Sequence, residues 1–145
     1  MNSQQQKTID DMLALMSSPE FIEKEKKRFK MERILKDKHI SKIKSFYSSP
    51  EEFQDFTNYN ILRHNSVWDQ KCYDLGYQPY NKKSMNILFD IAFNEGTTET
   101  IELDEFTTTF PSRVCEYYGF YFVYVYGQGT VSCIYNLNKE CIYST

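Results

Sequence analysis

Three residues of types that cooperate in covalent catalysis lie close together near the middle of the chain: His64, Asp69 and Cys72. A thiol becomes a good nucleophile when an imidazole takes its proton and a carboxylate orients that imidazole. Such a set is defined by its geometry, which spacing alone does not supply. No serine lies in a nucleophile-elbow motif, and no glycine-rich loop has phosphate-binding spacing. We therefore predict no catalytic residues and expect a protein that is not an enzyme.

Metal and disulfide chemistry has equally little support. The four cysteines, Cys72, Cys115, Cys133 and Cys141, contain no Cys-x-x-Cys pair, and the histidines form no His-x-x-His pair. Cys133 and Cys141 flank a predicted turn, and the register of that turn decides whether they share a face. We predict no metal site and no cofactor, and we expect reduced, packed thiols.

The strongest functional signal is a basic run from Lys24 to Lys44. Its 21 residues hold ten basic and three acidic side chains, a net charge of +7. On a helix, this run forms a charged stripe that fits a phosphate backbone. The residues that we assign to polyanion binding are Lys26, Lys27, Arg28, Lys30, Arg33 and Lys38.

Other interpretations of the basic run stay open. Eight of its ten basic residues are lysine, whereas arginine is the better reader of bases and of paired phosphate oxygens. The whole chain is acidic, with a net charge of −3, and residues 84–145 alone carry −6. The run is therefore also compatible with a solvated helix face, with pairing to the acidic C-terminal part, and with an acidic protein partner.

Tyrosine-rich strands are the second signal. Between 117 and 126 five tyrosines occur, and tyrosine is frequent at interaction hot spots. A two-residue turn at Gln128-Gly129 predicts two apolar sheet faces, one carrying Phe122, Tyr124 and Tyr126 together with Val131, Cys133 and Tyr135. One face packs on helices, and the other is covered by this chain, a second subunit, a partner or stacked bases. The predicted partner-binding residues are Tyr117, Tyr118, Tyr121, Tyr124 and Tyr126.

Capping and turn signals divide the chain into helices followed by strands. Ser-Ser-Pro-Glu occurs at 17–20 and at 48–51, where a serine cap and a proline begin a helix. We predict helices at 7–17, 19–47, 50–63, 67–75 and 84–94. Strands are expected at 100–106, 112–118, 120–126, 130–136 and 140–143, with a glycine-rich hairpin turn at 127–129. The acidic residues Glu99, Glu102, Asp104 and Glu105 are expected at a solvated strand edge, with an acidic or DNA-mimicking docking patch as the alternative.

These elements predict an α+β fold in which N-terminal helices, one of them long and basic, pack on a C-terminal antiparallel meander of three to five strands. We expect one domain over 1–145, mainly helical at 1–96 and sheet at 97–145. The composition, 41% hydrophobic and 26% charged, is that of a globular chain and excludes collagen-like and disulfide-scaffold classes.

The function that we expect is non-enzymatic docking on another macromolecule, with a protein partner or self-association favoured. Nucleic-acid binding through residues 24–44 is the alternative. No secretory signal and no apolar run of membrane length appear, so we expect a cytoplasmic protein without membrane contact. No small-molecule substrate is evident. The composition, rich in Lys, Asn, Ile, Phe and Tyr and poor in Ala and Gly, suggests an AT-rich genome and a phage or viral accessory protein that inhibits or adapts a host complex.

Overall fold

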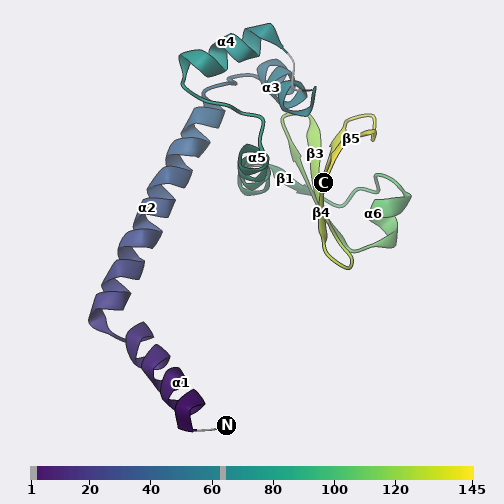
Figure 1. Ribbon diagram of the computed structural model, residues 1–145. Coiled ribbons are helices and arrows are strands. Elements are labelled where there is room, and N and C mark those ends of the chain that lie inside the picture. The colour runs from purple at the N-terminus through teal and green to yellow at the C-terminus, as the bar shows by residue number, and fades with distance from the viewer. Residues whose placement is uncertain (1–2, 63–64) are drawn as a thin grey trace. The chain divides into compact units, whose positions relative to one another are not determined.

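The computed structural model describes residues 3–62 and 65–145, except for the side chains of residues 15 and 16 (Figure 1). Residues 1–38 and residues 39–145 form two compact units. The sequence predicts a different division, into a mainly helical part up to residue 96 and a sheet part from residue 97. Neither division tests whether the whole chain folds as one domain, which stays a prediction.

The N-terminal unit consists of helix α1, Ser3–Met16, and most of helix α2, Pro19–Lys44. The break between them follows from the sequence, because Ser18 caps α2 and Pro19 occupies its first position. The backbone N–H of Phe21 donates to the Ser18 hydroxyl at 3.2 Å. An acidic Glu20 in the first turn and basic residues in the last turn complement the helix dipole.

Three further helices precede the sheet: α3, Pro50–Leu62, α4, Ser66–Asp74, and α5, Lys82–Glu95. Each begins at a side-chain cap. Ser49 accepts from the backbone of Glu52 at 3.2 Å, Asn65 caps α4, and Asn81 forms a capping box with Ser84. These caps satisfy backbone N–H groups that lack helical partners.

The sheet is an antiparallel meander of five strands in the order β1-β2-β3-β4-β5. The strands are Thr97–Glu99, Ser112–Tyr117, Phe120–Tyr126, Thr130–Asn136 and Cys141–Ser144. Gly96 joins α5 to β1, where a Cβ atom would collide with the carbonyl oxygens of Ala92 and Glu116. The predicted α+β fold, with helices followed by an antiparallel meander, is confirmed.

The register of the β3–β4 hairpin differs from the sequence prediction. Tyr126 pairs with Thr130 and Val125 with Val131, so that three residues, Gly127 to Gly129, form the turn. Phe122 therefore shares its face with Ile134, whereas Val123 shares the other face with Cys133. The predicted grouping of Phe122 and Tyr124 with Cys133 was wrong, because one extra turn residue moves every partner to the opposite face.

Both faces of the sheet are covered within the chain (Figure 1). One face packs on α3, α5 and the last turn of α2, in a core that includes Phe46, Phe53, Phe89 and Phe122. The other face packs against the segment after β1, through Leu103, in a second core. This segment contains a short helix, α6, Glu105–Thr109, where the sequence predicts a strand at 100–106. The prediction was wrong because Asp104 and Thr107 form a capping box that begins a helix.

Most of the other element boundaries agree with the prediction within two or three residues, and those of β3 and β4 agree fully. On α3, Leu62 is exposed, whereas the polar residues Thr57 and Asn60 are buried. The end of the predicted third helix and His64 fall at 63–64, outside the described residues.

Candidate functional site

The N-terminal unit has no core among its described residues. Across residues 3–38, no described side chain is buried. Eight large apolar side chains are exposed there, at Ile9, Met12, Leu13, Ile22, Phe29, Met31, Ile34 and Leu35. Ile22 and Phe29, seven residues apart, lie on one face of α2, and Ile34 lies on the opposite side. Fully burying one such side chain contributes about 1.5–3 kcal/mol, so contact between this surface and a partner is favourable.

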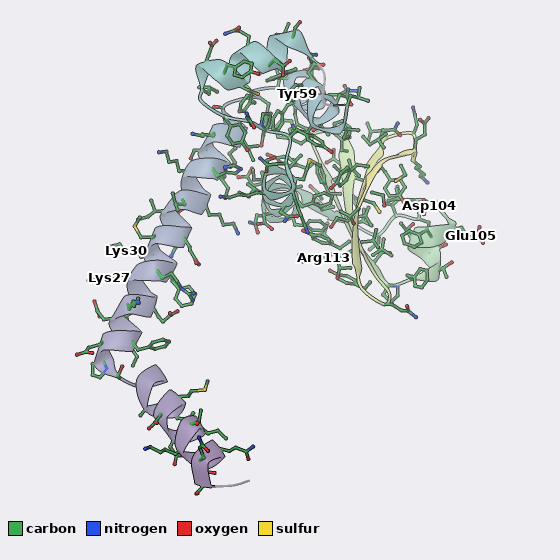
Figure 2. All side chains as sticks on the ribbon, in the orientation of Figure 1. Lys27, Lys30, Tyr59, Asp104, Glu105 and Arg113 are labelled. Carbon is green, nitrogen blue, oxygen red and sulfur yellow. The ribbon has the colours of Figure 1, made fainter. Side chains whose placement is uncertain are left out.

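The six residues predicted to bind polyanions, Lys26, Lys27, Arg28, Lys30, Arg33 and Lys38, are all exposed on α2. Figure 2 shows Lys27 and Lys30 on this helix. Arg28 contacts Glu25 at 2.5 Å, and its guanidinium lies 5.0 Å from the centroid of the Phe29 ring. Basic and apolar side chains are therefore both exposed along α2.

The structure does not bring the five predicted partner-binding tyrosines together. Tyr118 lies in the β2–β3 turn and Tyr126 at the far end of β3, about 20 Å away along a seven-residue strand. Tyr121 packs on the second core, and Tyr124 stacks on Phe93 with ring centroids 4.5 Å apart.

The remaining tyrosine, Tyr117, is buried. Its hydroxyl lies 2.9 Å from that of Tyr47 and donates to Glu95 at 3.0 Å, and Lys44 forms an ion pair with the same carboxylate. Burial raises the pKa of Tyr47 to about 12 and raises that of Tyr117 as well. These neutral phenols hold the end of α2 to α5 and the sheet.

Of the three residues considered above for covalent catalysis, only Asp69 and Cys72 lie in the described part of the chain. His64 lies outside it. Asp69 accepts a hydrogen bond from the Tyr59 hydroxyl at 2.6 Å. Burial raises the pKa of the Cys72 thiol to about 11, which keeps it protonated at neutral pH and poorly nucleophilic. The Nε2 atom of His39 is hydrogen-bonded to the Tyr77 hydroxyl at 2.7 Å, and the histidine is partly buried.

The acidic segment before and within α6 lies beside an apolar groove. Asp104 caps α6 and also accepts a hydrogen bond from the buried Tyr135 hydroxyl at 2.7 Å, so this carboxylate is structural. Phe106 and Phe110, with ring centroids 5.5 Å apart, line a groove of about 410 Å³ together with the tip of the β3–β4 hairpin. Asp104 and Glu105 lie at the start of α6 (Figure 2). Sequence reasoning missed this groove because it predicted a strand here.

Cysteine and metal chemistry add no further site. Cys72, Cys115 and Cys133 are buried and Cys141 is exposed, and all four are free thiols. Within residues 3–62 and 65–145, no group of three potential metal ligands occurs, and no helix is long and apolar enough to cross a membrane.

No family model, no curated protein and no solved structure matches the chain.

Proposed function

We propose that the protein is a non-enzymatic binding protein that docks on another protein, or on a second copy of itself, through the N-terminal unit. The observation that carries the proposal is the absence of any buried side chain among the described ones of residues 3–38, where eight large apolar side chains are exposed. Large exposed apolar surface on a folded protein is typical of interaction sites. A 14-residue helix such as α1 is marginal in water without a packing partner.

The mixture of apolar and basic side chains favours a protein partner. A phosphate backbone offers charge but little apolar surface, so Ile22 and Phe29 would gain nothing from it. A protein surface with acidic residues around an apolar groove complements both kinds of side chain. The sheet tyrosines are less suitable, because both sheet faces are covered within the chain.

The setting that we propose is the cytoplasm, in line with four free thiols. We also propose a phage or viral accessory role in which the protein inhibits or adapts a host complex. The composition of the chain and its small size are the support for this role.

Replacing Ile22 and Phe29 together with alanine is expected to abolish partner retention. Both side chains are exposed, and alanine favours helix, so the fold should be unaffected. Wild-type protein is immobilised and exposed to extract of the source cells, and retained proteins are quantified against the variant. Sedimentation of the free protein tests self-association in parallel.

A control carries Val67→Ala and Leu137→Ala, two apolar positions in the other unit that are also exposed. The proposal expects this control to retain the partner, or the second copy, as the wild type does. Equal retention by the two double variants contradicts it, as does a wild type that is monomeric and retains no protein.

Nucleic-acid binding is a second candidate, favoured by the exposure of all six predicted polyanion-binding residues. It predicts that labelled DNA or RNA binds at low salt and is released steeply as salt rises. Reversing Lys27 and Lys30 to glutamate is expected to make the slope of log K against log salt about 2 units shallower on duplex DNA, because each lost phosphate contact removes about 0.9. Fluorescence anisotropy measures this, and no binding at low salt excludes the candidate.

A further inference from the structure

A small pocket in residues 39–145 has aromatic walls and a single carboxylate. Its volume is about 150 Å³, and it lies between α3, α4 and the loop that follows. The side chains that line it are Tyr59, Asp69, Cys72, Tyr73, Tyr77, Gln78, Pro79 and Tyr80. Figure 2 labels Tyr59, which lies on α3. A cavity of about this volume holds a molecule the size of benzene, so a group of five or six heavy atoms fits.

The lining of the pocket contains one acidic side chain. Asp69 is the only acidic or basic residue among those that line it. The Tyr59 hydroxyl donates a hydrogen bond to Asp69 at 2.6 Å. Burial together with this hydrogen bond raises the pKa of Tyr59. The Cys72 thiol is likewise protonated. The Asp69 side chain thus lies among tyrosines, whose π faces and phenol oxygens carry partial negative charge.

Contacts behind the pocket hold its walls in place. The Tyr77 hydroxyl is hydrogen-bonded to His39, and burial and two nearby lysines lower the pKa of that histidine, which keeps it neutral. The ammonium of Lys42 lies 5.9 Å from the centroid of the Tyr77 ring. Tyr59 and Tyr77 are buried, which limits their movement.

We propose that this pocket binds a quaternary ammonium group, with the tyrosines enclosing the methyl groups and Asp69 supplying the opposite charge. Aromatic walls with one carboxylate are the chemistry by which proteins recognise methylated ammonium. A primary ammonium is strongly hydrated and needs several hydrogen-bond acceptors around it. A metal ion would need more oxygen or nitrogen ligands than one carboxylate. This site is independent of the docking proposed for the N-terminal unit.

The test is an NMR titration of the full chain with choline and with its neutral isostere, 3,3-dimethylbutan-1-ol. Choline is expected to shift the resonances of the pocket residues saturably, and the isostere is expected to leave them in place at the same concentration. Asp69→Asn, which keeps an oxygen acceptor for Tyr59, should weaken choline binding about fivefold, and Tyr73→Leu about threefold.

Tyr126→Leu is the matched control, because it replaces an exposed tyrosine that lies outside the pocket. This variant should bind choline as the wild type does. Tyr73 is also exposed, so its replacement should leave the fold intact, which the spectrum of the free variant verifies. Equal shifts by choline and the isostere overturn the proposal, as do choline shifts outside the pocket or an Asp69→Asn variant with unchanged affinity.

Discussion

Replacing Phe53 with alanine is expected to lower the free energy of unfolding by about 3–5 kcal/mol, because it removes a fully buried ring and leaves a cavity. Phe53 joins α3 to the sheet. Its ring lies within 4.8–6.3 Å, between centroids, of the rings of Tyr47, Tyr117, Tyr118, Phe120 and Phe122. Urea unfolding followed by circular dichroism measures the loss.

Phe106→Ala is the control for this substitution. The same atoms are removed, but Phe106 lines the groove and is exposed. The free energy of unfolding is therefore expected to fall by less than about 1 kcal/mol. Equal destabilisation by the two variants would contradict the assignment of the principal core to the side of the sheet that contacts α3.

Asp104→Ala is expected to destabilise the protein by about 2–3 kcal/mol. The substitution removes the N-cap of α6, typically worth about 1 kcal/mol, and the acceptor of the Tyr135 hydroxyl. Adding Tyr135→Phe should recover part of the loss, because the unpaired hydroxyl is then absent. Urea unfolding of the four proteins of this cycle measures the coupling, and strictly additive losses would contradict the hydrogen bond.

The same carboxylate should make stability depend on pH. Burial alone would raise the pKa of Asp104, but hydrogen bonds from Thr107 and Tyr135 outweigh it and hold the pKa below its usual value. The stabilisation is therefore full above the unfolded-state pKa, about 3.9, and is lost as pH falls through the folded-state value. Asp104→Asn, which keeps the cap, should lack this acid-dependent part, and an unchanged pH dependence would count against the assignment.

Local signals predicted most of the elements. Ser18 with Pro19 and the glycines after Tyr126 each fix a boundary through backbone geometry that needs no tertiary information. The cap formed by Asn81 and Ser84 was not predicted, and α5 begins two residues before the predicted start. The predicted assignment of side chains to the two sheet faces was wrong, because both a two-residue and a three-residue turn fit Gly-Gln-Gly. A difference of one turn residue moves every side chain of the following strand to the opposite face.

The candidate sites were less predictable, because burial depends on distant residues. Tyrosine is a residue type that is frequent in binding sites, yet Tyr117 is buried. Its hydroxyl is hydrogen-bonded to Tyr47, just after the end of α2, and to Glu95 of α5. Ile9, Met12 and Leu13 have the spacing of one helical face, but no described element of the N-terminal unit buries these side chains. The pocket for which we propose a quaternary ammonium ligand combines α3, α4 and a loop, and its four tyrosines show no spacing motif in the sequence.

The central claim is tested most directly by an affinity measurement. It compares how tightly the wild type and the Ile22→Ala/Phe29→Ala variant bind the captured partner, or a second copy of the chain. Each buried interface side chain of this size is worth about 1–2 kcal/mol, so the account predicts a dissociation constant at least tenfold higher for the variant. The Val67→Ala/Leu137→Ala control should bind as the wild type does. Equal affinities for all three proteins would contradict docking through the N-terminal unit.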